Sequence, residues 1–355
     1  MNILVLTKYS RQAASSRQRF YQFFPALESL GFSLRAQALL GDEYLAAMIE
    51  GRRRPVGVVL DAYRERWRLL RGASRADLVV IHFEAFPYLP DFAERQLARA
   101  GVPYVLDLDD AIFHQYDQHR NPLVRALLGG KIARIMRGAA AVHAGSRYIA
   151  DYARAAGARR VELLPTVVDT ARLSPAPSRT GPGFRVGWIG SPSTSSYLAD
   201  VAPALAQFHR VRPDAEFVLV GARADALPGL PVTRKPWSEA TEADDLRAFD
   251  VGIMPLRDDP WSRGKCGFKL VQYMACGLPV VASPVGANAD IVRAGVNGLL
   301  ASTPDEWVAA LAALAESPAE RERMGREGRA TVIARYSVDA VLPALAASLR
   351  AAATA

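Results

Sequence analysis

The stretch RGKCGFKLVQYMACGLPVVASPVG, residues 263–286, decides the fold of the C-terminal half of this chain. A turn that carries glycine and two lysines leads into a short helix, and the helix leads into an apolar strand. The turn at 266–268 lets the backbone approach a ligand, and the first amides of the helix would face negative charge. The chain has 39 Arg but only five Lys, so the spacing of Lys265 and Lys269 favours a phosphate or sugar site over two solvated lysines on an ordinary loop.

Apolar runs of strand length alternate with longer helical patterns along the whole chain, which is typical of parallel sheets covered by helices on both faces. The segment 165–185 interrupts this alternation with prolines, glycines and small polar residues, as an interdomain linker does. Two doubly wound α/β domains in tandem would leave a ligand cleft at the carboxyl ends of their strands. The predicted strands are Ile3–Leu6, Leu78–Ile81, Tyr104–Leu108, Ala140–His143, Val161–Leu164, Arg185–Ile189, Glu216–Val220, Val232–Arg234, Val251–Met254 and Pro279–Ala282.

We therefore expect an N-terminal Rossmann-like domain over residues 1–170, a linker over 171–184 and a C-terminal Rossmann-like domain over 185–335. Tyr336 and Ser337 then interrupt a helical region. That break would let a last helix, residues 336–355, cross back to the first domain.

Composition narrows the class of protein. At 355 residues the chain can bury two cores. Apolar runs never reach the length of a membrane-spanning helix, and the start MNILVLTKYS reads as a first strand without a basic leader. Cys266 and Cys276 support neither a disulfide framework nor a metal-ligand spacing. The composition predicts a soluble cytoplasmic protein.

The positive charge is concentrated in the first half of the chain. Residues 1–175 hold 25 Lys and Arg against 17 Asp and Glu, whereas residues 176–355 hold 19 against 19. Much of the excess lies in 52–75, where arginines alternate with apolar and aromatic residues. That pattern indicates an interfacial helix on an anionic membrane, with a solvated surface helix as the alternative. No nucleic-acid-binding module accompanies the charge, so nucleic acid is not an expected partner.

Two motifs follow predicted strands and could bind phosphate. GWIGSPSTSSYL, residues 187–198, places Gly190 before Ser191, Ser193 and Thr194, whose hydroxyls can bond a phosphate oxygen or cap a helix. KYSRQAASSRQRF, residues 8–20, brings two arginines to the start of the first helix, where they can neutralise a diphosphate or lie in solvent. These arginines are Arg17 and Arg19.

Polar and aromatic residues at other strand ends suggest acceptor and base binding. YVLDLDDAIF, residues 104–113, ends in Asp109 and Asp110, which could hold a cation, orient a hydroxyl, act as a base or cap a helix. His82 and Glu84 should face the same cleft. Trp237 can stack on a nucleobase or pack in the core, and His143 is expected in the core.

With these residues in hand, the chain resembles a retaining glycosyltransferase of the GT-B fold, family 4 (glycosyl transferases group 1). The block at 250–300 carries the resemblance. The family often has two glutamates in this block, and the matching positions here are Gly264 and Gln272. A family histidine also matches Asp109. The fold expected is therefore α/β, with two tandem Rossmann-like doubly wound domains facing an interdomain cleft.

The resemblance implies metal-independent transfer of a sugar, with retention, from a nucleotide diphosphate sugar to a glycan or lipid-linked acceptor, with no cofactor. Lys265 and Lys269 would stabilise the leaving diphosphate, and Asp109 or Asp110 would orient the acceptor. The remaining residues implied are, for the donor, Arg17, Gly190, Ser191, Ser193, Thr194, Trp237, Gly267, Phe268 and Gln272, and for the acceptor, His82, Glu84 and Arg19.

The setting expected is synthesis of a cell-surface polysaccharide or glycolipid, by a cytoplasmic enzyme held peripherally at the inner face of the membrane. Two alternatives stay open. One is a nucleotide-sugar epimerase of the same fold, which would need no acceptor. The other is a catalytically silent glycan- or nucleotide-binding partner subunit, which the replacement of both family glutamates at Gly264 and Gln272 favours.

Overall fold

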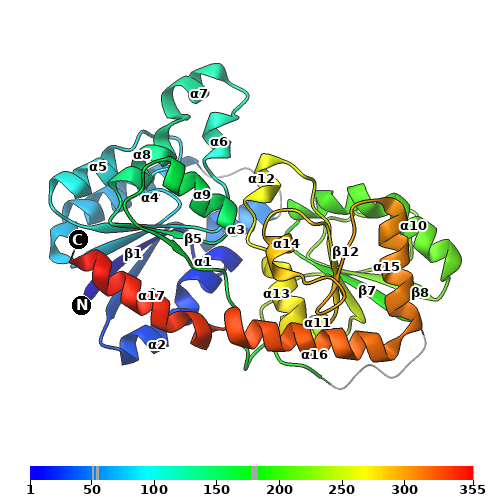
Figure 1. The fold of residues 1–355 in the computed structure, drawn as a ribbon. Coiled ribbons are helices and arrows are strands. Elements are labelled where there is room, and N and C mark those ends of the chain that lie inside the picture. The colour runs from blue at the N-terminus through cyan, green and yellow to red at the C-terminus, as the bar shows by residue number, and fades with distance from the viewer. Residues whose placement is uncertain (50–51, 53–55, 177–182, 355) are drawn as a thin grey trace. The chain divides into compact units, whose positions relative to one another are not determined.

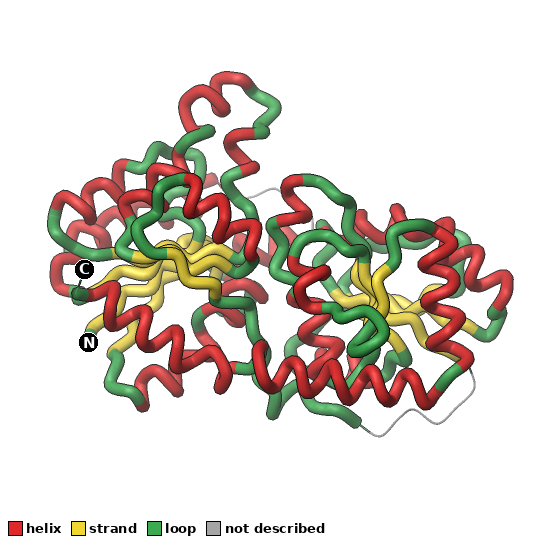
Figure 2. The backbone as a smooth tube through the Cα atoms, in the orientation of Figure 1, coloured by secondary structure: helices red, strands yellow, loops and turns green. Residues whose placement is uncertain are grey.

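The computed structural model describes residues 1–49, 52, 56–176 and 183–354, and it divides into two compact units. Unit 1 comprises residues 1–166, the short segment 264–266 and the chain from Val341 onward. Unit 2 comprises residues 167–263 and 267–340. Each unit is a six-stranded parallel sheet with helices packed on both faces, as Figures 1 and 2 show. The expected pair of doubly wound α/β folds is confirmed.

The sheet of unit 1 has the strand order β2-β1-β3-β4-β5-β6, and every neighbouring pair is parallel. Its central strands are continuous apolar runs, because helices cover both of their faces. β3, for example, is buried along its whole length. The strands are β1 (Asn2–Tyr9), β2 (Ser33–Leu40), β3 (Leu78–His82), β4 (Tyr104–Leu108), β5 (Ala141–Ala144) and β6 (Val161–Leu163).

Helices connect these strands. The α-helices of the first part of the chain are α1 (Ala14–Arg19), α2 (Phe24–Ser29), α3 (Asp42–Ile49), α4 (Val56–Arg71), α5 (Phe92–Arg99), α6 (His114–Asp117), α7 (Pro122–Leu128), α8 (Lys131–Gly138) and α9 (Arg147–Ala155). Two 3₁₀ turns accompany them, η1 (Tyr21–Phe23) and η2 (Ala73–Arg75). The last helix, α17 (Val338–Ala353), belongs to unit 1 from Val341 onward.

The sheet of unit 2 has the order β12-β11-β10-β7-β8-β9, again with parallel neighbours. Two apolar clusters pack on this sheet, one that includes Tyr273 of α13 (Phe268–Ala275) and one that includes Phe217 of β8 (Ala215–Val220). The strands are β7 (Phe184–Ile189), β8 (Ala215–Val220), β9 (Val232–Lys235), β10 (Val251–Met254), β11 (Val280–Ala282) and β12 (Leu299–Leu300).

The helices of unit 2 begin with local caps where the sequence supplies them. Thr303 and Glu306 form a reciprocal capping box at the start of α15, and Ser317 caps α16. The elements are η3 (Thr194–Tyr197), α10 (Leu198–Val211), α11 (Glu242–Arg247), α12 (Pro260–Arg263), α13 (Phe268–Ala275), α14 (Ala287–Ile291), α15 (Pro304–Glu316) and α16 (Pro318–Arg335). None of the helices in the described ranges is long and apolar enough to cross a bilayer.

All ten predicted strands are present, with ends shifted by at most a few residues, but β2 and β12 were not predicted. β2 is an edge strand whose residues Arg35 and Gln37 make it look polar. Gln37 fits this strand because its side-chain and backbone oxygens both accept hydrogen bonds from the buried Arg66. β12 has only two residues and depends on its pairing with β11. A strand this short has no local sequence pattern from which it could be predicted.

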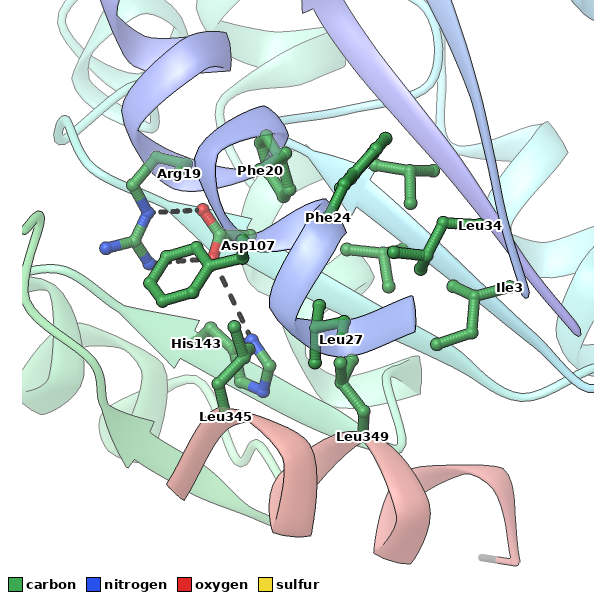
Figure 3. A pocket seen from close by; sticks show the side chains of 13 residues that line it. Ile3, Arg19, Phe20, Phe24, Leu27, Leu34, Asp107, His143, Leu345 and Leu349 are labelled. Carbon is green, nitrogen blue, oxygen red and sulfur yellow. Dashed lines mark hydrogen bonds and ion pairs between the residues drawn. The ribbon is translucent and has the colours of Figure 1, made fainter. Parts of the chain in front are cut away.

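A buried polar chain joins α17 to the sheet of unit 1. His143 of β5 contacts the hydroxyl of Ser348 through Nε2 at 2.9 Å, and its Nδ1 lies 3.8 Å from Asp107. Asp107 also accepts two hydrogen bonds from Arg19, at 2.9 and 2.7 Å. Figure 3 shows Arg19, Asp107 and His143 of this chain beside Leu345 and Leu349 of α17. His143 is therefore a satisfied core residue, as expected.

A cavity of about 30 Å³ adjoins this chain and is lined otherwise by apolar side chains such as Phe20 and Leu27 (Figure 3). Ligand pockets usually measure roughly 300 Å³ or more. The cavity also excludes Asp109 and Asp110, so it is a packing gap beneath α17 and not a sugar site.

Burial lowers the pKa of His143 to about 4, since the charged imidazole would lose its hydration. Between the unfolded pKa of about 6.5 and this folded value, the unfolded chain binds more protons. We therefore expect the free energy of unfolding to decrease as pH falls from 6.5 to 4, by at most roughly 3 kcal/mol from this group.

Urea unfolding of the wild type and of His143→Gln at pH 7, 5.5 and 4.5 tests this expectation. The decrease in the free energy of unfolding on acidification should be smaller in His143→Gln, because glutamine cannot bind the proton. Parallel pH profiles for the two proteins would contradict it.

Candidate functional site

In unit 2, the turn before α13 requires glycine. Gly267 is the N-cap residue of α13 and has φ of 68°, in the left-handed region that side chains disfavour. A Cβ at Gly267 would also lie 2.3 Å from Cδ1 of Ile291. The turn therefore brings the chain close to α14 and starts the eight-residue α13 with its amide groups at the helix N-terminus, where negative charge is favoured.

Lys269 lies in the first turn of α13, beside the end of β7. Its ammonium is 5.5 Å from the centre of the Trp188 ring. A Cβ at Gly190 would lie 2.6 Å from the Trp188 ring and 2.8 Å from Cε of Lys269, so the glycine leaves room for both side chains. The structure thus places the predicted catalytic Lys269 beside the predicted donor-binding Gly190.

The predicted hydroxyl turn follows directly after Gly190. Ser191 and Ser193 contact each other through their hydroxyls at 2.9 Å, and the Ser191 amide donates to the Thr194 hydroxyl at 3.2 Å. Ser191 and Ser193 are exposed. The turn is therefore held by its own side chains and presents hydroxyls at the carboxyl end of β7.

A buried carboxylate organises the predicted base-binding residues. Glu242, at the start of α11, accepts hydrogen bonds from Trp237 Nε1 at 3.1 Å and from Gln272 Nε2 at 2.9 Å. Arg172 pairs with its second oxygen. Trp237 is half-buried and Gln272 is buried. Glu242 was not predicted as a site residue, although it lies in a visible acidic run after Trp237.

Gly264, one of the two positions where the family has glutamate, is tightly packed. It belongs with Lys265 and Cys266 to the segment assigned to unit 1. A Cβ at Gly264 would lie 2.2 Å from Cβ of Ala111 and 3.0 Å from its amide nitrogen. A glutamate would not fit there without moving the backbone, so the loss of this carboxylate is built into the local packing.

The two predicted catalytic lysines differ in surroundings. Lys265 Nζ lies 3.3 Å from Asp110 of unit 1, whereas Lys269 lies on α13 of unit 2. The neighbouring Cys266 thiol donates to the Asp109 carbonyl. Burial raises the pKa of Cys266, and the charge of Asp109 raises it further, so this thiol is a packing group and not a nucleophile.

At the carboxyl edge of the unit 1 sheet, His82 donates from Nε2 to Asp109 Oδ1 at 3.2 Å. Phe83 stacks on the His82 ring with centroids 3.8 Å apart and has φ of 68°. A left-handed conformation in a residue of this size costs of order 1–3 kcal/mol and is typical of functional sites. Lys8, which the sequence analysis did not single out, lies 5.6 Å from the Phe83 ring centre.

Asp109 is held ionised. Burial alone would raise its pKa, but the hydrogen bond and charge of His82, together with the charge of Arg19, hold the pKa of Asp109 below its usual range. The His82 side chain is completely buried, while the Asp109 side chain keeps 13% exposure. His82 therefore contacts Asp109 from the interior, and its expected exposure at an open cleft is not observed.

Glu84 also departs from expectation. Its carboxylate is buried, accepts hydrogen bonds from Tyr116 at 2.8 Å and pairs with the fully buried Lys131. The expected position of Glu84 at an open cleft is therefore wrong. Removal of either partner would leave an uncompensated buried charge, so Lys131 and Tyr116 hold Glu84 in the interior.

The first-helix arginines are buried and not solvated. Arg17 donates to the carbonyls of Arg11 and Gln12, and Arg19 donates to Asp107 and to the carbonyl of Leu164. These bonds give Arg19 a structural role at the strand ends, and its proposed contact with an acceptor stays a prediction.

The basic segment 52–75 has fewer surface arginines than its sequence suggests. Arg66 is fully buried on α4 and donates to the carbonyls of Thr7 and Gln37. Burial lowers the pKa of Arg66 to about 9. Arg64, Arg68 and Arg71 are exposed, whereas residues 53 and 54 lie outside the described ranges.

Over the residues that the structure describes, no three His, Cys, Asp or Glu side chains are grouped so as to hold a metal ion. The carboxylates in and after β4 are directed to different partners: Asp107 to Arg19, Asp109 to His82 and Asp110 to Lys265.

Two family models match the chain. "Glycosyl transferase 4-like domain" matches residues 25–167 and "Glycosyl transferases group 1" matches residues 183–317. A D-inositol 3-phosphate glycosyltransferase of Segniliparus rotundus is 27% identical over 225 residues, covering 56% of this chain and 48% of that protein. The chain spans about half the length of the relatives it matches in this way.

Solved structures share the fold over nearly the whole chain. Sucrose-phosphate synthase of Thermosynechococcus elongatus has a TM-score of 0.74 at 17% identity, covering 99% of this chain and 98% of that one. HepE of Anabaena, solved with UDP-glucose, has a TM-score of 0.73 at 18% identity and covers 99% of each chain. At these identities the likeness establishes a GT-B-like fold and nothing finer.

The stability of the Glu242 cluster, formed with Trp237, Gln272 and Arg172, should depend on the charge at residue 272. Gln272→Glu removes a donor and places a second negative charge beside a buried carboxylate, so the free energy of unfolding should fall by about 2 kcal/mol at pH 7. Chemical denaturation measures this loss. The charge swap Glu242→Gln/Gln272→Glu should recover part of it, and an additive double variant would show that the two side chains are not coupled.

Proposed function

Because the chain belongs to the glycosyl transferases group 1, we propose that it transfers a sugar, with retention, from a nucleotide diphosphate sugar to an acceptor. The observation that carries this proposal is the meeting of Lys269, the N-terminus of α13 and the side-chain-free Gly190 at the end of β7. A lysine and helix amides at one strand end are the groups that a diphosphate requires.

The chemistry follows from where charge develops. As the bond between the sugar and the diphosphate breaks, the diphosphate gains negative charge and the sugar gains oxocarbenium character. Lys269 and the α13 amides would stabilise the leaving group, with the Ser191–Thr194 hydroxyls as further donors. Lys265, which lies 3.3 Å from Asp110, would add a second cation if it exchanges that partner for the diphosphate.

The base and ribose of the donor would lie near the Glu242 cluster. Trp237 would stack on the base, and the Gln272 carboxamide oxygen would accept from a ribose hydroxyl, since its nitrogen is already bonded to Glu242. HepE was solved with UDP and UDP-glucose, so UDP-sugars are the first donors to test.

The acceptor would bind to unit 1. Asp109, ionised and aligned by His82, would orient the acceptor hydroxyl, and Lys8 supplies a nearby cation that suits a phosphorylated or lipid-diphosphate acceptor. We propose a glycan or lipid-linked acceptor in surface polysaccharide or glycolipid synthesis, at the cytoplasmic face of the membrane. The exposed arginines of α4 would contribute to membrane contact.

A second candidate is a catalytically silent nucleotide-binding subunit, and the packing of Gly264 on Ala111 favours it. A turnover measurement distinguishes the two candidate functions. An enzyme converts donor in the presence of acceptor, whereas a silent subunit binds donor without consuming it. No observation in this structure favours an epimerase.

Lys269→Ala should weaken UDP-sugar binding by about tenfold or more, because a charge-assisted contact to phosphate is lost. Calorimetric titration of the full chain measures the dissociation constant. The matched control is Arg210→Ala, which removes an exposed cation at the far end of α10 from the β7 strand end. Equal affinities for the wild type and Lys269→Ala would remove the basis of the donor site.

Turnover should not depend on a divalent ion, because we assign stabilisation of the leaving group to Lys269 and helix amides. We expect the same rate of UDP release with magnesium and with excess chelator. Abolition by chelator, with recovery on adding one metal, would point instead to the carboxylates after β4 as metal ligands.

A further inference from the structure

The short helix α7 carries the most exposed large apolar side chains in the described part of the chain. Leu123 is 68% exposed and Leu127 is 72% exposed. They are four residues apart, so they share one face of the helix, while Leu128 is buried on the other side. Apolar side chains gathered on an exposed surface mark an interaction site.

Local bonds hold this face in a defined shape. Asn121 caps α7 by accepting from the Leu123 amide at 2.9 Å, and Pro122 occupies the first turn. Arg125 donates to the carbonyls of His119 and Arg120, at 2.7 and 3.2 Å. Figure 1 shows α6 and α7 projecting from the sheet and helices of unit 1. The two leucines are therefore presented at the tip of an ordered projection.

The charge at this tip has one sign. Residues 118–130 include Arg120 and Arg125, both exposed, and contain no aspartate or glutamate. Exposed leucines next to arginines, with no acidic residue among them, suit the interface of an anionic bilayer. There, apolar side chains enter the boundary of the acyl chains and guanidinium groups bind lipid phosphates.

Contacts link this projection to α4. Tyr88 is 54% exposed, and its ring centre lies 6.3 Å from that of His119. The preceding Pro87 carbonyl accepts from Tyr63 of α4 at 2.8 Å. Leu60, one turn before Tyr63, is 53% exposed. Exposed tyrosine is favoured at the membrane interface, where its ring is buried and its hydroxyl stays wet.

We propose that α7 is a membrane anchor: Leu123 and Leu127 insert into the interface of an anionic phospholipid bilayer, and Arg120 and Arg125 bind its phosphates. This anchor lies outside the basic segment 52–75, and the exposed Leu60 of that segment would add a further apolar contact. It rests on the proposed function only in that a lipid-linked acceptor would give the anchor a purpose.

Flotation of the full chain with vesicles tests the anchor without donor or acceptor. Vesicles of phosphatidylcholine with phosphatidylglycerol should bind the wild type, and Leu123→Ser/Leu127→Ser should weaken that binding by roughly tenfold or more. The matched control, Val211→Ser/Ile333→Ser, removes two apolar side chains of 60% and 50% exposure from unit 2 and should bind as the wild type does. Arg120→Gln should weaken binding to these vesicles but not to pure phosphatidylcholine.

A fluorophore on Leu127→Cys measures insertion directly, since the native Cys266 and Cys276 are buried and should not react. Its emission should shift to the blue with anionic vesicles and be quenched by brominated acyl chains. If Leu123→Ser/Leu127→Ser is less stable than the wild type, the fluorophore still tests membrane insertion, because its signal does not depend on that variant.

Three outcomes overturn the anchor: no wild-type binding to anionic vesicles, equal binding by the α7 pair and the wild type, or loss of a dimer in the α7 pair with vesicle binding intact. The last would assign the face to a second copy of the chain. UDP-sugar binding by the α7 pair should equal that of the wild type. Absent donor binding in all variants would count against the proposed function and leave the anchor standing.

Discussion

The parallel register of the strands is the constraint on which the candidate site depends. Every strand of a parallel sheet ends at the same edge, so residues distant in sequence converge there. β3 and β4 pair His82 with Asp107 in register, and Asp109, two residues after Asp107, contacts the His82 ring. In unit 2 the same rule places Gly190 after β7 beside the helix that follows Gly267.

Buried charges then position the groups at these edges. Asp107 is held by Arg19, Glu84 by Lys131 and Tyr116, and Glu242 by Arg172. Each carboxylate would be costly in the interior without its partner, and the need for that partner selects one arrangement of the surrounding elements. The candidate functional groups, Asp109, Gln272 and Trp237, are in turn aligned by such interior residues.

Residues at strand ends were predictable as a class but not in their individual roles. Lys269, Gly190 and Asp109 were expected at binding positions and do lie at strand or helix ends. Glu84 lies two residues past an equally clear strand, yet it is buried, because Lys131 and Tyr116 reach it from 47 and 32 residues away. Glu242 was not predicted because Gln272 and Arg172 reach it from 30 and 70 residues away.

By itself, the sequence determined the fold class and the positions of ten strands, since buried parallel strands are local apolar runs bounded by turn residues. It also determined the glycine turn before α13, which φ of 68° requires. Only the tertiary structure decided which charges are buried, that β2 joins the sheet edge, and that Leu123 and Leu127 are exposed although leucine usually enters a core. These outcomes depend on side chains meeting across long sequence separations, where burial and pairing energies outweigh local propensity.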